Sequence, residues 1–177
     1  MLEIGQKGPG FALPGVDGQT YDLEHLLTAH RAVVVIFSCN HCPYVRAWEG
    51  RMMQLQDDYR AQGVALVAIN ANDAVRYPDD NFDAMKARAR EMNFNFPYLR
   101  DDSQDTARQY GATHTPHGFL LDSSGTLRYR GAIDDNYDDP DAVQHHYLRD
   151  ALDSVLAGET PTHQTSGAVG CTIKWVG

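Results

Sequence analysis

The sequence has few cysteines, no long apolar run and no excess of positive charge, and each absence excludes a class of protein. Three cysteines in 177 residues are too few for a disulfide-rich scaffold. No stretch approaches the roughly 20 apolar residues of a membrane-spanning helix, and residues 1–7 lack the layout of a signal peptide. We therefore expect a cytoplasmic protein without a membrane partner.

The charge balance disfavours nucleic acid as a partner. Lys and Arg number 15 against 24 Asp and Glu, which gives a net charge of −9, whereas phosphate binding needs a basic patch. The length fits one domain, since domains commonly have about 100–200 residues. We expect residues 1–158 to form that domain and residues 159–177 to form a tail packed on it, in a monomer or a weak dimer.

The most informative stretch lies between residues 33 and 48. The apolar, β-branched run Val33–Phe37 predicts a strand that is buried on both faces. Pro43 then opens a helix, because the N–H that proline lacks is unpaired in a first turn anyway. Cys39 and Cys42 therefore lie where a buried strand ends and a helix begins.

This position favours redox chemistry, because free N–H groups and the helix dipole stabilise a thiolate at a helix start. We predict that Cys39 lies at or just before the N-cap, has a lowered pKa and acts as the nucleophile. Cys42 would lie about one turn inside the helix as the resolving thiol. Asn40 and His41 lie between them, and we expect His41 to donate a hydrogen bond or a positive charge to the Cys39 thiolate.

Two other interpretations of the cysteine pair stay open. The cysteines could simply close the end of a strand. They could also belong to a structural zinc site, which usually needs four ligands, completed by Cys171 and by His41, His114 or His117. Because the sequence has only one C-x-x-C pair, we expect neither a metal nor a cofactor.

Hydrophobic periodicity and turn residues predict the other elements. The expected elements are a hairpin at 17–18, helix 22–28, strand 64–69, a helix from 81, strand 96–99, helix 103–110 capped by Ser103, strands 117–121 and 126–131, and a last helix from Pro140 to Leu156. Residues 70–80 read as a polar loop. The acidic residues 134–139 read as a solvated turn, because they lack the glycine and the final glutamate of an EF-hand.

Two further motifs and the order of these elements resemble a known superfamily. The lead-in Gly8–Pro14 resembles G-x-x-A-P-x-F-x-L, and Tyr110–Asp122 resembles Y-G-V-x-x-T-P-x-x-F-L-I-D. The chain thus resembles the thioredoxin superfamily, and within it the TlpA/ResA-type and AhpC/TSA proteins. The resemblance implies a thioredoxin-like α/β fold in which helices flank a central mixed β-sheet, with an N-terminal extension and a helix–strand insertion.

The resemblance also implies roles for Thr115 and Pro116. Pro116 would follow a cis peptide bond and pack opposite Cys39. The backbone of Thr115 would pair with an extended substrate segment, as an edge strand does.

The sequence departs from the superfamily pattern at two points. Ser38 replaces the tryptophan that usually precedes the first cysteine, and the strand Val33–Phe37 carries no buried acid. The group that takes the proton from Cys42 is therefore open. Glu49 is a candidate, although we expect it to be exposed.

The third cysteine has two interpretations. Cys171 could be a second resolving thiol that forms a disulfide with Cys39 or Cys42. It could also be an apolar filler on a short strand with Ile173 and Trp175, which we favour.

The predicted function is thiol–disulfide exchange on protein or small-molecule disulfides and thiols. A peroxiredoxin-like thiol peroxidase is an alternative, although the threonine of its T-x-x-C motif is replaced by Cys39 in one register and by Ile36 in the other. A metal-binding module without catalysis is a third possibility. The substrate, the electron donor and the direction of exchange stay open.

Overall fold

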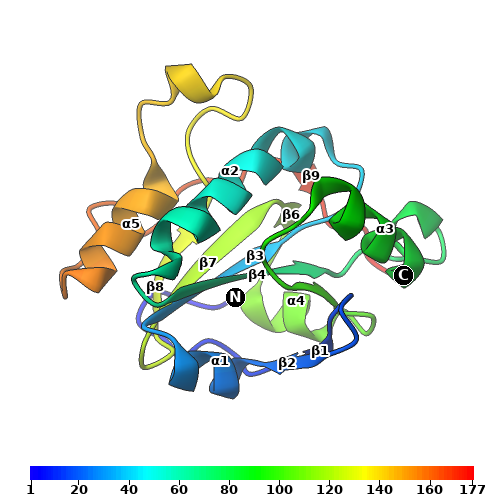
Figure 1. Cartoon of the computed structure of the whole chain (residues 1–177), viewed down its shortest axis with the longest axis horizontal. Helices are drawn as coiled ribbons and strands as arrows, with labels where there is room; N and C mark the ends of the chain where they lie inside the picture. The colour runs from blue at the N-terminus through cyan, green and yellow to red at the C-terminus, as the bar shows by residue number, and fades with distance from the viewer.

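A five-stranded mixed β-sheet forms the centre of the protein, and the computed structural model describes residues 1–177 (Figure 1). In spatial order the strands are β5 (Tyr98–Arg100), β4 (Val64–Asn70), β3 (Ala32–Phe37), β7 (His117–Asp122) and β8 (Leu127–Gly131). β3 is parallel to β4 and β4 to β5, whereas β7 is antiparallel to β3 and β8. The predicted α/β fold with a central mixed sheet is confirmed.

The remaining elements lie around this sheet. The helices are α1 (Leu23–Ala29), α2 (Pro43–Arg60), α3 (Phe82–Met92), α4 (Asp105–Tyr110) and α5 (Tyr147–Leu156), with 3-10 turns η1 (Pro78–Asp80) and η2 (Pro140–Ala142). β1 (Ala12–Pro14) and β2 (Thr20–Asp22) form the predicted N-terminal hairpin, and β6 (His114–Thr115) pairs with β9 (Cys171–Thr172).

The central strand β3 is apolar throughout because it separates two hydrophobic layers. Successive side chains of a strand point to opposite faces. Val34 and Ile36 accordingly pack in the cluster of α2 and α5, while Val33 and Val35 pack in the cluster of α1 and α4. Figure 1 shows α2 and α5 above the sheet and α1 below it.

Helix α2 begins at Pro43 and buries one stripe of side chains, as its periodicity predicts. The buried apolar residues are Val45, Trp48, Met52, Leu55 and Tyr59. Burying an apolar side chain of this size contributes roughly 1.5–3 kcal/mol. The stripe therefore fixes α2 on the sheet and, with it, the position of the cysteines at its start.

The predicted start of the last helix is wrong. Only the 3-10 turn η2 follows Asp139, and α5 begins at Tyr147 rather than at Pro140. The carboxylate of Asp135 accepts hydrogen bonds from the backbone N–H groups of Gln144 and His145, at 3.0 and 3.1 Å. These bonds replace helical ones and hold the segment before α5 in an irregular loop.

Two smaller expectations also need correction. α4 begins at Asp105 after Gln104, which has φ 67° and takes the cap position predicted for Ser103. Asp134 is not part of a solvated turn, because it is buried and accepts from Trp48 Nε1 at 3.0 Å and from Arg51 Nη1 at 2.6 Å. A buried indole N–H and a partly buried guanidinium need such an acceptor.

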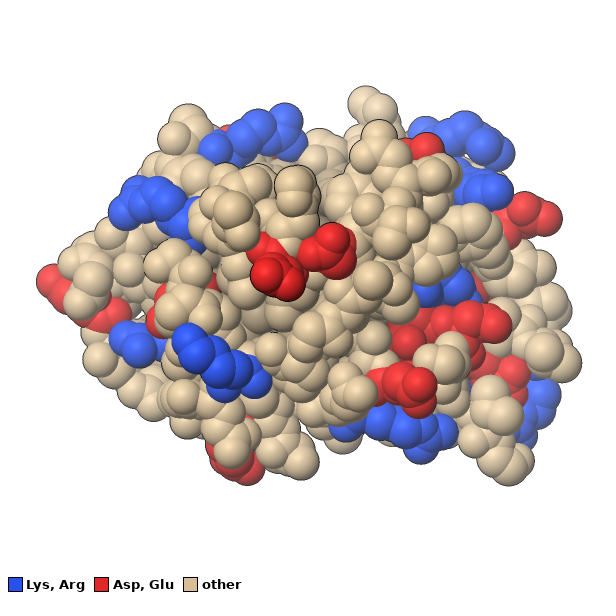
Figure 2. Space-filling model, turned by 90° about the horizontal axis from the view of Figure 1, so that it is seen from below, with Lys and Arg blue, Asp and Glu red and all other residues tan.

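The outer surface carries charges of both signs. Figure 2 shows the side of α1 and the β1–β2 hairpin, where Lys and Arg are interspersed with Asp and Glu and form no continuous patch on that face. None of the helices has the length and the apolar character needed to cross a membrane.

Candidate active site

One pocket of about 290 Å³ is lined by all three cysteines of the chain. Cys39 lies in the loop after β3, Cys42 lies directly before α2, and Cys171 begins β9. The pocket is also lined by Asn72, Arg76, Tyr77, Pro78, Asp79 and Asp80 from the segment between β4 and α3, and by His41, Pro43, Thr115, Thr172 and Lys174. Three segments far apart in the sequence therefore meet at the C-x-x-C pair.

Both cysteines lie farther before the helix than predicted. Cys42, not Cys39, is the N-cap of α2, and the first helical hydrogen bond runs from Arg46 N–H to the Cys42 carbonyl at 3.0 Å. Proline disfavours helical dihedrals in the residue before it, and Cys42 has φ −61° and ψ 124°. Pro43 thus fixes the start of the helix and excludes Cys42 from it.

The pKa values of the two thiols are shifted in opposite directions. The pKa of Cys42 is lowered to about 4, chiefly by the hydrogen bond with the Cys39 thiol and also by the Cys171 thiol and the backbone N–H groups of Val45 and Cys171, against the opposing effect of burial. The hydrogen bond with Cys42, burial and the carboxylate of Asp80 raise the pKa of Cys39. The predicted lowered pKa of Cys39 is therefore wrong.

Thr115 contacts both sulfurs of the pair. Its hydroxyl lies 3.3 Å from Cys39 Sγ, and the Cys42 thiol in its neutral form donates to the Thr115 carbonyl oxygen at 3.3 Å. The Thr115–Pro116 peptide is cis, and both residues are buried. Thr115 thus lies beside the cysteines, where the resemblance placed it.

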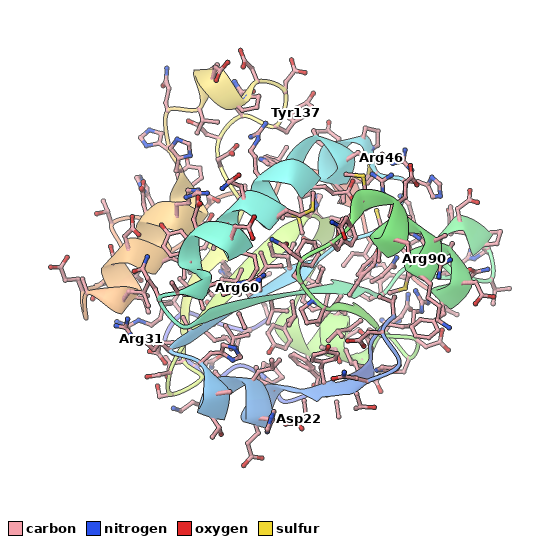
Figure 3. The ribbon with its side chains drawn as sticks, in the orientation of Figure 1. Asp22, Arg31, Arg46, Arg60, Arg90 and Tyr137 are labelled. Carbon is pink, nitrogen blue, oxygen red and sulfur yellow. The ribbon has the colours of Figure 1, made fainter.

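The two residues between the cysteines have different surroundings. His41 is half exposed and lies 3.7 Å from Asp79 Oδ2, without the predicted contact with Cys39. Asn40 is buried, and its carbonyl accepts from Arg46 Nε at 3.0 Å; Figure 3 shows Arg46 near the start of α2. Its side-chain oxygen accepts from Tyr98 OH at 2.7 Å. Asn40 therefore holds the loop in place, whereas His41 faces the pocket.

Sequence reasoning missed Asp80, a buried carboxylate that lines the pocket of the pair. Asp80 accepts from Asn40 N–H at 2.8 Å and from the side-chain amides of Asn70 and Asn72 at 3.0 Å each. Its negative charge raises the pKa of Cys39. The available signal was the run of Asn and Asp directly after a buried strand, a position where polar groups meet at a sheet edge.

Glu49 is buried, contrary to expectation, and it forms a salt bridge with Arg88 of α3. Arg88 also donates from Nε to Glu49 Oε2 at 3.3 Å. A buried carboxylate needs such a partner, because an unpaired charge in the interior is strongly unfavourable. The Glu49 carboxylate therefore joins α2 to α3 through Arg88, and its hydrogen bonds go to Arg88 rather than to a cysteine.

The histidines considered as zinc ligands have other partners. His117 lies buried in β7 and accepts from Thr113 N–H at 3.2 Å, and burial, followed by the charges of His114 and Arg130, lowers its pKa to about 4. His114 Nδ1 lies 2.7 Å from Thr113 Oγ1. The side chains of the chain form no group of three potential ligands with the geometry to hold a metal ion.

Comparison with known proteins gives consistent results. Residues 4–130 match the AhpC/TSA family. The chain is 32% identical over 138 residues to the thiol:disulfide interchange protein DsbE of Escherichia coli (strain K12), covering 75% of this chain and 67% of that protein. It is 24% identical over 127 residues to the thiol-disulfide oxidoreductase ResA of Halalkalibacterium halodurans, covering 72% and 67%. An uncharacterized conserved protein from Geobacillus kaustophilus superposes with a TM-score of 0.93 at 38% identity, covering 99% of this chain and 94% of that one.

Proposed function

The chain belongs to the AhpC/TSA family and is a thioredoxin-like thiol–disulfide oxidoreductase, as its sequence predicts, and we propose that Cys39 and Cys42 carry its reaction. The observation that supports this assignment is the contact of both sulfurs with Thr115, while Cys42 caps α2. The neighbouring thiols and the backbone N–H groups favour Cys42 as the thiolate, while the hydrogen bond with Cys42, burial and the Asp80 carboxylate favour Cys39 as the thiol.

The ionised sulfur makes the first attack, because the thiolate is the nucleophile in disulfide exchange. The Cys42 thiolate attacks one sulfur of a substrate disulfide, and the other substrate sulfur leaves as a thiolate. Cys39 then attacks Cys42 Sγ in the mixed disulfide and releases the second substrate sulfur. The proton of Cys39 and one from solvent protonate the two released thiolates. The order of attack is thus the reverse of the one expected from the sequence.

The same steps run backwards when the oxidised pair meets a dithiol. The substrate is a disulfide or thiol of a protein or a small molecule that can enter the pocket. The pocket is lined by charges of both signs, from Arg76 and Lys174 and from Asp79. Charge alone therefore selects neither an acidic nor a basic substrate.

Insulin reduction by the wild-type protein, C39S and C42S tests the proposal, with dithiothreitol as the electron source. Each single variant is expected to lose at least 100-fold in turnover, since each lacks one of the two required sulfurs. To test the order, the same substitutions are made in C171A, so that Cys171 cannot substitute. C39S/C171A should accumulate a mixed disulfide with substrate, whereas C42S/C171A should not.

Two results would contradict the proposal. Unchanged insulin reduction in both single variants would remove the pair from the reaction. A mixed disulfide that accumulates only in C42S/C171A would restore Cys39 as the first nucleophile.

Hydrogen peroxide offered in place of insulin should be consumed more slowly, because the peroxidatic threonine is missing from the motif.

A further inference from the structure

The C-terminal tail occupies the edge of Thr115. β9 is antiparallel to β6, with Cys171 opposite Thr115 and Thr172 opposite His114 (Figure 1). Beyond the bridge, Ile173 N–H donates to the Thr113 carbonyl at 3.0 Å, and the Ile173 side chain is buried in the core below the sheet. The resemblance to the thioredoxin superfamily implies that this edge receives an extended substrate segment.

Both sides of Cys171 are fixed to the rest of the protein. Lys174 N–H donates to Asn72 Oδ1 at 2.9 Å, which joins the tail to the segment that carries Asp80. On the other side, a Cβ atom on Gly170 would lie 2.1 Å from the Thr115 carbonyl oxygen. Only glycine allows the backbone to pass so close, so the chain before Cys171 is pressed against Thr115.

Cys171 therefore presents its thiol to the cysteine pair. It packs against the small cluster of Cys39, Cys42 and Val45. All three cysteines line one pocket, and Cys171 stands opposite Thr115, whose carbonyl oxygen lies 3.3 Å from Cys42 Sγ. The thiols of Cys42 and Cys171 accordingly shift each other's pKa, which is lowered for Cys42 and raised for Cys171. Cys171 is only partly buried, so its sulfur is not enclosed as an apolar filler would be.

We propose that Cys171 is a third redox thiol, which the tail presents to Cys42 in the place of a substrate cysteine. This inference rests on the proposed exchange at Cys39 and Cys42. In the step, the Cys171 thiolate attacks Sγ of Cys42 in the Cys39–Cys42 disulfide. That disulfide breaks, a Cys42–Cys171 disulfide forms, and the electron pair goes to Cys39, which takes up the proton lost by Cys171. One disulfide replaces another, so no further oxidant or reductant is required.

The step gives the protein two internal disulfides of equal oxidation state. In the first state, a disulfide joins Cys39 and Cys42, and the Cys171 thiol is free. In the second, the tail is covalently joined to the start of α2, and the Cys39 thiol is free beside Thr115. Cys171 is thereby a reacting group rather than a packing residue.

The test uses C39S, in which only Cys42 and Cys171 can form an internal disulfide, with C39S/C171S as the matched control. Both proteins are oxidised with oxidised glutathione, and free thiols and non-reduced peptides are then analysed. In C39S the free thiols should fall from two per chain to none, with a Cys42–Cys171 peptide. The control should give a glutathione adduct on Cys42. Equal circular dichroism spectra and melting temperatures would show that both variants fold.

A folded C39S that yields only glutathione adducts would overturn the inference. Wild-type protein provides the separate control for the proposed function: a Cys39–Cys42 disulfide should form there whether or not Cys171 reacts. If the wild-type protein forms that disulfide and no disulfide-linked peptide involves Cys171 at any glutathione ratio, Cys171 is a packing residue. If no Cys39–Cys42 disulfide forms, it is the exchange reaction itself that fails.

Discussion

The ionisation of Cys42 should be visible in how the reduction potential of the pair depends on pH. An ordinary dithiol takes up two protons with two electrons, so its potential falls by about 59 mV per pH unit. With a Cys42 pKa of about 4, reduction above pH 5 adds a proton to Cys39 only. The potential should then fall by about 30 mV per pH unit between pH 5 and 8.

The same ionisation sets the size of the potential at pH 7. A pH of 7 lies about three units above a pKa of about 4. Each unit stabilises the thiolate by about 1.4 kcal/mol, so ionisation of Cys42 stabilises the reduced protein by about 4 kcal/mol. Since 1.4 kcal/mol corresponds to about 30 mV, the potential should lie about 90 mV above the value of about −270 mV for thioredoxin. The disulfide would then be a moderately strong oxidant.

The assay equilibrates wild-type protein with glutathione buffers at pH 5, 6, 7 and 8, quenches with acid and counts free thiols at Cys39 and Cys42 by peptide mapping. The ultraviolet absorbance of the thiolate, titrated from pH 3 to 9, gives the pKa independently. A slope near 59 mV per pH unit throughout this range, with no thiolate absorbance below pH 7, would refute the assignment of the charge to Cys42.

Two further predictions concern the buried charges around the site. Asp80→Asn removes a negative charge that raises the pKa of Cys39, so the pH midpoint for alkylation of Cys39 should be lower in C42S/D80N than in C42S; an equal or higher midpoint would show that the carboxylate does not act on this sulfur. Arg88→Leu leaves the Glu49 carboxylate buried without its partner and should lower the free energy of unfolding in urea by about 3–5 kcal/mol. The E49Q/R88L double variant should recover part of this loss. An R88L protein as stable as the wild type would show that the ion pair does not stabilise the fold.

The fold could be predicted from local patterns, because its central elements depend on them. The apolar run of β3 and the three-and-four spacing in α2 each specify one structure, and Pro43 marks their junction. The order of elements and the Thr115–Pro116 motif then suggested the superfamily. The error at Pro140 came from a side chain, Asp135, that binds the backbone N–H groups a helix would otherwise use.

The site was less predictable, because its contacts join residues distant in sequence. The two cysteines could be identified from the sequence, but the N-cap of α2 is Cys42 rather than Cys39, because Pro43 disfavours helical dihedrals in the residue before it. The pairing of Thr115 with Cys171 spans more than fifty residues and leaves no local pattern other than Gly170. A two-residue strand is also too short for periodicity to detect.

The source of the buried carboxylate follows from the central strand. β3 lies between two apolar layers, where an ionised acid would lack partners and would be strongly unfavourable. Asp80 instead comes from the segment after β4, where the amides of Asn70 and Asn72 stabilise its charge. That charge raises the pKa of Cys39, while the helix start and the neighbouring thiols lower that of Cys42. Two like groups with pKa values driven apart can divide the work of a nucleophile and a proton donor. In the order of attack that we propose, Asp80 acts together with the Cys42 hydrogen bond and burial to keep on Cys39 the proton that a departing substrate thiolate needs.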